Sequence, residues 1–464
     1  NKKNRCLMCG IAGILKFNGQ RVTAAELKRM TDTIEHRGPD GEGHWANQNG
    51  NVGFGHRRLS IIDLSEGGSQ PMHYCGTRFT ITFNGEIYNY IELKERLIKK
   101  GYKFHSASDT EVLLALYEDK GERCLEDLDG MFAFAIWDEE EQELFCARDR
   151  FGEKPFFYVQ SSDFFAFGSE MKELWAMTGK KSPNTQMVSD YIRYGYLHHP
   201  QHPEQTFYKD IIQLPPAHYI KISRTGGDQV RKYWDIDINF QDSISFESAK
   251  ERFRELFTES VKRRLRSDVP VGSSLSGGLD SSLVVCLIDQ LLSPQGKAVN
   301  TFSARFRNFV KDEGKFMQYV IDKTSARANF VYSESDVLNT ELDRIFFHQE
   351  EPFGSASILV QYQVFQLAKE KGVTVLLDGQ GADEILAGYT PYYQTYFNEL
   401  RKGGSKEYRT QLDAYLQMYG NEVMPSLAIG SRSSVKDYVR RSIPGLVRTI
   451  RRIKKRGTAP SHNL

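Results

Sequence analysis

The sequence predicts a protein of mixed α/β and α+β class, with stacked antiparallel sheets in its first half and a parallel sheet in its second. Up to about residue 210 the chain is rich in short apolar runs separated by turns, which is typical of antiparallel sheets. From about residue 245 apolar runs and amphipathic segments alternate, which is typical of a parallel sheet covered by helices. The length of 464 residues suits two or three domains.

In the first half, the strands are expected where apolar runs stand between turns. The spacing also predicts three helices: one with Thr23 as N-cap that ends before Gly38-Pro39, one that ends at Gly101, and one over 109–121. Laid on the sheets, these helices predict helical layers outside stacked strands. The runs are GIAGILKF (10–17), VGFGHRRLSIID (52–63), RFTITFNGEIYN (78–89), GMFAFAIWD (130–138), ELFCARDRFG (143–152) and FFAFGS (164–169).

In the second half, a helix over 245–265 comes first, and strands and helices then follow in turn. Strand, helix and strand in this order favour a parallel sheet, whose ligands bind at the carboxyl ends of the strands. The expected strands are 269–276, 300–306 and 373–379, and the expected helices are 283–292, 314–326 and 355–372.

Composition excludes several functions. Lys and Arg number 61 against 60 Asp and Glu, a net charge of +1, so no global field draws the chain to nucleic acid or to a membrane. No apolar run reaches the roughly 20 residues of a membrane span. Cys6 and Cys9 are too isolated for a four-ligand zinc site, and the cysteine pattern fits a reduced, cytoplasmic setting.

The two ends of the chain are unusual. The sequence begins with Asn1, so we expect that this is not the translation start. Residues 431–456 hold ten Lys or Arg and one Asp, a charge of about +9. We expect a solvated helix there; an amphipathic helix on an anionic membrane surface is the alternative.

The strongest motif is SLSGGLDSSL (274–283), placed where an apolar run ends and a helix begins. Gly277 and Gly278 allow a close backbone approach to an anion, serine hydroxyls line the loop, and the helix start adds free N–H groups. Asp280 would repel phosphate unless it holds Mg²⁺. The motif therefore predicts a phosphate site, and it lacks the Lys of a P-loop.

A second acidic turn, VLLDGQGADEILAGY (375–389), follows another expected strand. Its Asp378, Asp383 and Glu384 suit a second metal ligand close to the phosphate loop. Acidic turns are common, so the signal gains its weight from the motif about 100 residues before it.

Three polar clusters in the first half are GHRRLSIID (55–63), FNGEIYN (83–89) and SASDTE (106–111). Recognition of glutamine needs an Arg for its carboxylate and an acid for its ammonium, which Arg58 and Asp109 offer. Asn84 and the Gly85 N–H suit an oxyanion hole, and Glu86 adds polar recognition. The alternatives are a plain hairpin turn at Asn84-Gly85-Glu86 and surface charges at Arg58 and Asp109.

Cys9, within MCGIAG (8–13), is a candidate nucleophile. A cysteine at a chain terminus can use its own α-amine as general base, and removal of Met8 would place Cys9 there. The alternative is a buried structural thiol.

These motifs together resemble the glutamine-dependent asparagine synthetase family, in which an N-terminal nucleophile glutaminase precedes an ATP pyrophosphatase-type synthetase domain. The resemblance covers about residues 8–395. It implies a four-layer αββα class II glutamine amidotransferase domain over 9–215 and a parallel-sheet synthetase domain over 240–464. The motifs that carry it are MCGIAG, HRGPD (36–40), RLSIID (58–63), NGEIYN (84–89), SDTE (108–111), RDRFGEKP (148–155), LPPAH (214–218), SGGLDSS and DGQGADE.

The resemblance implies a role for each matching residue. Cys9 would attack glutamine, with Asn84 and Gly85 in the oxyanion hole, and ammonia would pass through an internal tunnel to an aspartyl-adenylate made from ATP and aspartate. The glutamine site would comprise Arg58, Leu59, Ile61, Asn84, Glu86 and Asp109. The ATP and pyrophosphate site would comprise Leu275, Ser276, Gly277, Gly278, Leu279, Asp280, Ser281, Ser282, Ala304, Asp378 and Gly379, with Mg²⁺ on Asp280 and Asp383.

Three departures from the family pattern stand out. Residues 1–8 precede the nucleophile, and an amide-bonded Cys9 amine is no base. Gln380 stands where the family usually has Glu. A later Lys and an ExRxPFLD-like stretch are missing, so we expect the second domain to be truncated at its C-terminal end.

Three functional hypotheses follow. The first is a glutamine-hydrolysing asparagine synthetase, a carbon–nitrogen ligase whose partners are glutamine, aspartate and ATP, compatible with a homodimer. The second is a related amidotransferase that acts on another carboxylate, on a peptide or a surface-polysaccharide sugar. The third is an inactive, partner-binding remnant tethered by its basic helix.

Overall fold

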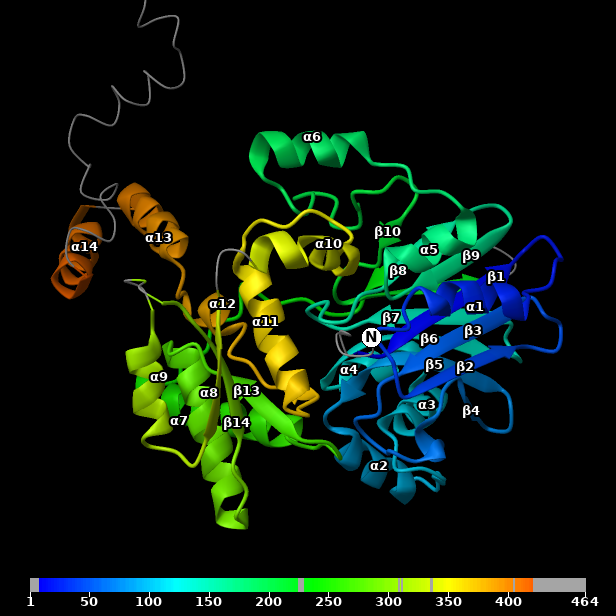
Figure 1. Ribbon diagram of the computed structural model, residues 1–464, viewed down its shortest axis with the longest axis horizontal. Helices are drawn as coiled ribbons and strands as arrows, with labels where there is room; N and C mark the ends of the chain where they lie inside the picture. Colours follow the sequence, from blue (N-terminus) through cyan, green and yellow to red (C-terminus); the bar gives the residue numbers. More distant parts are fainter. Residues whose placement is uncertain are drawn as a thin grey trace, which may run out of the picture. The chain divides into compact units, whose positions relative to one another are not determined.

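The computed structural model describes residues 8–223, 229–307, 309, 312–333, 337–403 and 405–419. The chain divides into two compact units, 1–378 and 379–464, and Figure 1 shows the elements of both. The basic segment 431–456 lies outside the described residues. In the part of the chain that is described, no helix has the length and apolar character needed to cross a lipid bilayer.

Two antiparallel sheets of six strands each form the first half of unit 1, as the sequence predicts. The first sheet has the order β10-β8-β9-β1-β3-β2 and the second the order β12-β11-β7-β6-β5-β4. The strands of the first are β10 (Ile212–Gln213), β8 (Phe157–Gln160), β9 (Phe164–Gly168), β1 (Gly10–Lys16), β3 (Val52–Arg58) and β2 (Gly41–Ala46); those of the second are β12 (Gln229–Lys232), β11 (His218–Ser223), β7 (Glu143–Arg148), β6 (Gly130–Asp138), β5 (Phe79–Ile87) and β4 (Met72–Tyr74).

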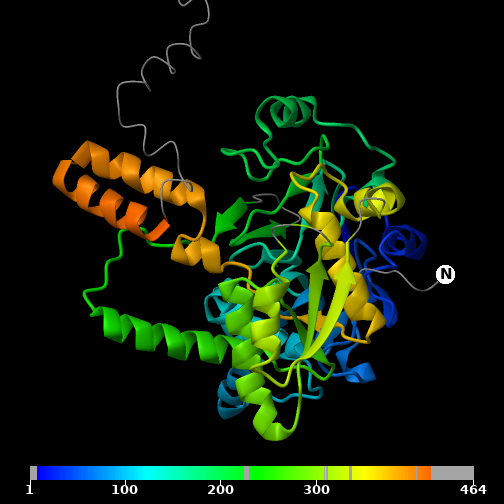
Figure 2. The ribbon, with the colours of Figure 1, turned by 60° about the vertical axis from the view of Figure 1, so that its left-hand side comes forward.

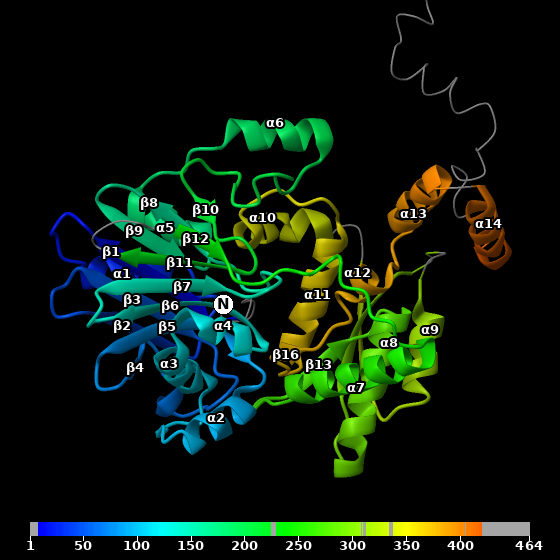
Figure 3. The same cartoon turned by 180° about the vertical axis from the view of Figure 1, so that it is seen from behind.

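Apolar faces explain why the two sheets stack and why helices cover them. Phe54, Trp137 and Phe165 are buried in the cluster between the sheets. Helices α1 (Ala24–Asp32) and α5 (Met171–Thr178) cover the first sheet, and α2 (Tyr90–Lys99) and α3 (Asp109–Lys120) cover the second. These four layers, seen from behind in Figure 3, confirm the predicted αββα arrangement. The short helix α4 (Cys124–Asp127) adds Cys124 and Leu125 to the core beneath the second sheet. Helix α6 (Thr185–Tyr194) follows α5 in the chain.

Several local predictions can be compared with the structure. Thr23 is the N-cap of α1, and a capping box with Glu26 completes it. The hairpin interpretation of Asn84-Gly85-Glu86 is wrong, because these residues lie inside β5 and pair with 131–133 of β6. The second sheet also extends past residue 215, since β11 and β12 belong to it.

A parallel sheet of four strands forms the second half of unit 1, with the order β15-β14-β13-β16. Its strands are β13 (Val271–Ser274), β14 (Asn300–Arg305), β15 (Arg327–Tyr332) and β16 (Val375–Leu376). The sequence did not predict β15, and β16 is shorter than the predicted 373–379. Because strand and helix alternate, all strands run in parallel.

Helices pack on both faces of the parallel sheet, as Figure 2 shows. Helices α7 (Phe246–Arg264), α8 (Leu279–Leu292) and α9 (Gly314–Ile321) bury one face through Val261, Val285 and Met317. Helix α11 (Ser357–Glu370), preceded by α10 (Val337–Gln349), covers the other through Val364 and Ala368. Unit 2 contains α12 (Ala382–Leu386), α13 (Thr390–Gly403) and α14 (Ser405–Tyr419), the last two packed around Phe397 and Tyr415.

Candidate active site

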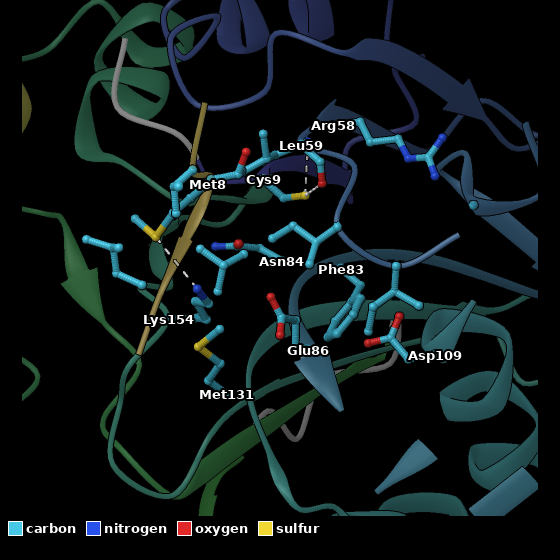
Figure 4. Close-up of a pocket in the computed structure, with 18 of the residues that line it drawn as sticks. Met8, Cys9, Arg58, Leu59, Phe83, Asn84, Glu86, Asp109, Met131 and Lys154 are labelled. Carbon is cyan, nitrogen blue, oxygen red and sulfur yellow. Dashed lines mark hydrogen bonds between the residues drawn. The ribbon is translucent and has the colours of Figure 1, made fainter. Parts of the chain in front are cut away.

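A cavity of about 360 Å³ in unit 1 brings together every residue that the sequence predicts for glutamine. Cys9, Arg58, Asn84, Glu86 and Asp109 all line it, although 100 residues separate the first from the last. Leu59, Ile61 and Gly85 line it as well. In Figure 4, Arg58 and Asp109 lie on the right of the cavity, Met8 and Lys154 on the left, and Cys9 and Asn84 between them.

Cys9 stands immediately before β1, with its thiol held by the backbone of Leu59. The Leu59 N–H donates to Sγ at 3.3 Å, and the thiol donates to the Leu59 carbonyl at 3.4 Å. Burial raises the pKa of this thiol, while the Leu59 hydrogen bond and the nearby cations of Lys154 and Arg37 act against that rise. The thiol lines a cavity together with the cations of Lys154 and Arg58, and such electropositive surroundings favour a nucleophile over an inert structural cysteine.

Arg37 fixes the backbone of Cys9, the candidate nucleophile, through a contact that sequence reasoning missed. Its Nε donates to the Cys9 carbonyl at 2.8 Å, and its Nη1 donates to Glu170 at 2.8 Å. The Arg37 carbonyl accepts from the Met8 N–H at 2.9 Å. Arg37 belongs to the HRGPD motif. The sequence marked this motif as part of the family resemblance but did not indicate that its arginine holds the Cys9 backbone.

Lys154 is a second residue that the sequence analysis did not assign. Its Nζ lies 3.6 Å from the Met8 sulfur and lines the same cavity as Cys9 and Glu86. Burial lowers the pKa of this ammonium group, and the Glu86 carboxylate opposes the change. The RDRFGEKP motif therefore brings a desolvated cation into the site.

Two hydrogen-bond donors at the open edge of β5 face the cavity beside Cys9. The side-chain nitrogen of Asn84 is buried and has no hydrogen-bond partner among the described residues. The N–H groups of Phe83 and Ile87 donate to side chains beyond this edge, so the N–H of Gly85 between them points the same way. Two donors beside a thiol suit an oxyanion hole.

Gly85 admits no side chain, because a Cβ there would lie 2.3 Å from the Met131 carbonyl oxygen. The glycine therefore keeps β5 close to β6 and leaves its own N–H open to the cavity. This backbone constraint explains why a glycine follows Asn84 in the middle of a strand.

Two of the carboxyl groups that line the cavity, Asp109 and Glu86, have a pKa that burial raises. Asp109 begins α3, which is capped by Ser108, and it accepts from the Ile87 N–H at 2.9 Å. Burial raises the pKa of Asp109 to about 6 and that of Glu86 to about 7. One oxygen of Glu86 has no hydrogen-bond partner in the described part of the chain. The alternative interpretation of Asp109 as a surface charge is wrong.

Arg58 ends β3, and its guanidinium group is held by the loop that follows. Nη1 donates to the Ser65 carbonyl at 2.8 Å, and Nη2 donates to the Asp63 carbonyl. Gly68 makes room for it, since a Cβ there would lie 2.1 Å from Nη2. The loop thus presents a fixed cation to the cavity, at the end opposite Lys154 in Figure 4.

The far wall of the cavity comes from the parallel-sheet half of unit 1. Side chains of α11 that recur at helical spacing and the end of β16 line it: Tyr362, Phe365, Gln366, Lys369, Val375, Leu376 and Asp378. The sequence predicted a helix over 355–372 but gave no signal that one of its faces would line a cavity. The cavity therefore extends from Cys9 to a predicted nucleotide residue, Asp378.

The loop 275–279 has the shape that a phosphate requires. Gly277 adopts φ +91°, where a side chain would be strained. Gly278 is the N-cap of α8, and as a glycine it has no side chain to accept a hydrogen bond. The N–H groups in the first turn of this helix are therefore not capped by a side chain of the N-cap residue. The Ser276 and Ser281 hydroxyls lie 3.0 Å apart, and Ser276 accepts from the Gly278 N–H.

The other residues predicted for the nucleotide have different positions and exposures. The Asp378 carboxylate accepts from the Ser274 N–H at 3.1 Å, which brings the ends of β16 and β13 together. Leu275 is buried, Leu279 is exposed, and Ala304 packs in the sheet core. Ser282 donates to the Gly278 carbonyl at 2.7 Å.

The expected metal ligands do not form a cluster within either unit. Among the described residues, no group of three or more His, Cys, Asp or Glu side chains could hold a metal ion. Asp280 lies in the first turn of α8, in unit 1. Asp383 lies in the first turn of α12, in unit 2. Gly379 is the first residue of unit 2 and precedes α12. Mg²⁺ binding by Asp280 and Asp383 stays a prediction.

The fold and the cavity define a class of protein in which an antiparallel amidotransferase domain precedes a parallel-sheet domain with a phosphate loop. Comparison with protein families agrees with this division. Residues 8–234 match the family described as Glutamine amidotransferase domain, and residues 252–454 match the family described as Asparagine synthase.

Similar proteins identify the family. The chain is 35% identical over 410 residues to a Methanocaldococcus jannaschii protein with the provisional name asparagine synthetase (glutamine-hydrolyzing) 2, covering 84% of this chain and 77% of that protein. It is 36% identical to asparagine synthetase (glutamine-hydrolyzing) 1 of Bacillus subtilis, covering 83% and 59%. It is 29% identical to amidase chry2 of Gibberella zeae, covering 83% and 60%. The chain belongs to the glutamine-hydrolysing asparagine synthetase family.

The matched part of the chain spans less than two thirds of several relatives, with 59%, 64% and 52% of the three Bacillus subtilis proteins covered. ATP use follows from the family. The reaction of the whole protein, its acceptor and the role of each residue are taken up as proposals below.

Proposed function

We propose that the protein is a glutamine-hydrolysing asparagine synthetase, with Cys9 as the nucleophile of its first half and ATP-dependent amide formation in its second. The cavity that extends from Cys9 to Asp378 carries the proposal. It gives a route for ammonia from the place where glutamine is split to the end of β16, where the nucleotide is expected.

Glutamine binds with its α-carboxylate on Arg58 and its α-ammonium on Asp109, which places its carboxamide at Cys9. The Cys9 sulfur attacks the carboxamide carbon, and Asn84 and the Gly85 N–H bind the oxyanion that forms. The C–N bond then breaks, a proton passes to nitrogen, and ammonia leaves. Water attacks the resulting thioester, which releases glutamate and restores the thiol.

The Cys9 α-amine is the proposed general base, and it can act only when Met8 has been removed. Met8 lines the same cavity and its N–H is bonded to Arg37. Removal of Met8 would therefore free the amine and also clear part of the cavity.

In the second half, the side-chain carboxylate of the acceptor attacks the α-phosphorus of ATP, and pyrophosphate leaves. The loop from Ser276 to Ser282 would hold pyrophosphate through its N–H and hydroxyl groups. Ammonia then attacks the acyl carbon, which gives the amide and AMP. Asp280 and Asp383 are the carboxylates that would hold Mg²⁺, which would supply charge neutralisation at the phosphates.

Aspartate is the proposed acceptor, because the asparagine synthetases of Bacillus subtilis are similar over most of this chain. A second acceptor class, another carboxylate, has two observations in its favour. Amidase chry2 matches over a comparable length, and Gln380 replaces the Glu usual in the family, so this position carries no anion.

The test supplies [¹⁵N-amide]glutamine, aspartate and MgATP to the protein with Cys9 as its first residue. We expect labelled asparagine, glutamate and pyrophosphate in equal amounts. Absence of both labelled asparagine and pyrophosphate overturns the proposal. A screen of carboxylates by pyrophosphate release distinguishes the acceptors: turnover of another acid with rejection of aspartate favours the second class.

A further inference from the structure

Asp63 is hydrogen-bonded both to Arg58 and to the segment that carries Asp109, the two charged groups of the proposed glutamine site. Its carbonyl accepts from the Arg58 guanidinium, and its carboxylate accepts from the Ala107 N–H at 2.9 Å. Ala107 comes two residues before Asp109. One residue therefore holds both the cation for the glutamine carboxylate and the segment that carries the anion for the glutamine ammonium.

The backbone of Asp63 is in an unusual conformation for a residue other than glycine. Its φ is +54°, in the left-handed region, where asparagine and aspartate are tolerated at some cost. The side chain compensates in part, because its Oδ1 accepts from the Ser65 N–H at 3.1 Å and from the Ser65 hydroxyl. Such a conformation persists only where the surroundings fix it.

The fixing contact comes from the other half of unit 1. Asp268, in the segment between α7 and β13, accepts from the Asp63 N–H through Oδ2 at 2.8 Å. Its own N–H donates to the Ile61 carbonyl at 3.0 Å. This reciprocal pair of bonds clamps the loop 59–68 at two points, one of them at a residue that lines the cavity.

The segment that carries Asp268 is itself anchored. Arg266 donates to both Glu92 carboxylate oxygens at 2.7 Å and to the Tyr88 carbonyl at 2.7 Å. Three residues after Asp268 the chain enters β13, which leads to the phosphate loop. The clamp therefore joins the glutamine loop to the base of the strand that presents the nucleotide site.

We propose that Asp268 is a positioning residue for glutamine recognition: it holds Asp63, and through Asp63 it sets Arg58 and Asp109 at the separation that the two charges of glutamine require. The inference rests on the proposed glutaminase function. Asp268 does not line the cavity, so its effect on glutamine passes through the loop.

The choice of substitutions follows from the two bonds. Asp268→Ala removes the acceptor for the Asp63 N–H and keeps the backbone bond to Ile61, whereas Asp268→Asn keeps an oxygen acceptor in the same place. Ser267→Ala is the matched control, because among the described residues the Ser267 hydroxyl bonds only to Val269 in its own turn.

The first measurement is glutamate release against glutamine concentration in the whole protein with Cys9 first. We expect Asp268→Ala to raise KM for glutamine about tenfold, as loss of one hydrogen bond to a charged acceptor implies, with kcat changed much less. Asp268→Asn should restore most of the affinity, and Ser267→Ala should resemble the wild type. Ammonia-supported pyrophosphate release should be the same in all four proteins.

The second measurement is backbone hydrogen exchange, which needs no turnover. Asp268→Ala should speed exchange in both 59–66 and 105–110, and Asp268→Asn in neither. Unchanged exchange or an unchanged KM in Asp268→Ala overturns the proposal, as does an equal KM effect in Ser267→Ala. A wild-type protein that neither hydrolyses glutamine nor is protected by it overturns the proposed function itself, and that failure is seen without any variant.

Discussion

The glutamine cavity and the phosphate loop hold their polar groups in opposite ways. In the cavity, Asn84 is 1% exposed, and Glu86 and Asp109 are each 5% exposed. In the loop, Leu279 is 83% exposed, and Ser276 is exposed as well. The first site consists mainly of desolvated side chains, whereas the second combines backbone N–H groups with the exposed hydroxyl of Ser276 and the buried residue Ser281.

This difference has an energetic meaning. A buried polar group without a partner is unfavourable, and the raised pKa values of Asp109 and Glu86 reflect that desolvation. The groups are therefore arranged before the substrate arrives, which favours stabilisation of a transition state. A loop of glycines and hydroxyls stays hydrated until an anion replaces the water. Single substitutions should accordingly act through chemistry in the cavity and through backbone conformation in the loop.

Loss of the proposed nucleophile should abolish the activity of the cavity and leave the activity of the phosphate loop unchanged. We expect Cys9→Ala to lose all glutamate release, because no other thiol lines the cavity among the described residues, and to retain ammonia-supported pyrophosphate release. Cys286→Ala, which changes an exposed free thiol, is the control. Glutamine-dependent product from Cys9→Ala would contradict the assignment.

The same comparison extends to the residues before Cys9. A protein that keeps residues 1–8 should release no glutamate, since its Cys9 nitrogen is an amide, while ammonia-supported activity should persist. Mass spectrometry of the N-terminus together with glutaminase assays of both forms checks this. Full glutaminase activity with Met8 attached would rule out the α-amine as base.

Removal of one oxyanion donor should have the next largest effect. We expect Asn84→Ala to lower kcat for glutamine hydrolysis about 10²- to 10³-fold with little change in KM, because the donor acts on the transition state. Asn89→Ala is a matched control, since Asn89 bonds the Asp127 carbonyl and does not line the cavity. An effect on KM alone would instead place Asn84 in substrate binding.

The phosphate loop should respond through its backbone. Gly277 has φ +91°, and a Cβ there would lie 2.9 Å from the Glu313 carbonyl oxygen. We expect Gly277→Ala to reduce ATP-dependent pyrophosphate release roughly tenfold, from a conformational cost of about 1–2 kcal/mol, and to leave glutamate release unchanged. Gly296→Ala is the control, because Gly296 also has a positive φ but a Cβ added there would have no neighbouring atom within 4 Å. Equal losses in both variants would show general destabilisation only.

Local patterns predicted helices laid on antiparallel sheets, the parallel sheet and the charged residues of the glutamine set, whereas the αββα layers and the roles of Leu59 and Ile61 came from the family resemblance. Apolar periodicity marks β5 and α3, and residue chemistry marks Cys9, Arg58 and Asp109. Arg37, Lys154 and Asp63 were missed, since their roles depend on partners more than 20 residues away along the chain or on backbone conformation. The face of α11 that lines the cavity was also missed, because helical spacing does not say what a helix faces.

The last predicted effect, of about the same size as that of Gly277→Ala, concerns the pH dependence of the cavity. Asp109 must be ionised to bind the ammonium of glutamine, and burial raises its pKa to about 6. Affinity should therefore be full above this pH and be lost as the pH falls through it, with kcat/KM for glutamine about tenfold lower at pH 5 than at its plateau. The pH dependence of kcat/KM reports the pKa of Asp109 in the enzyme without bound glutamine. Asp109→Asn should lower kcat/KM above pH 6, by less and less as the pH falls below it, and abolish the step near pH 6, whereas Glu86→Gln should keep it. A step that survives in Asp109→Asn would assign the titration to another group.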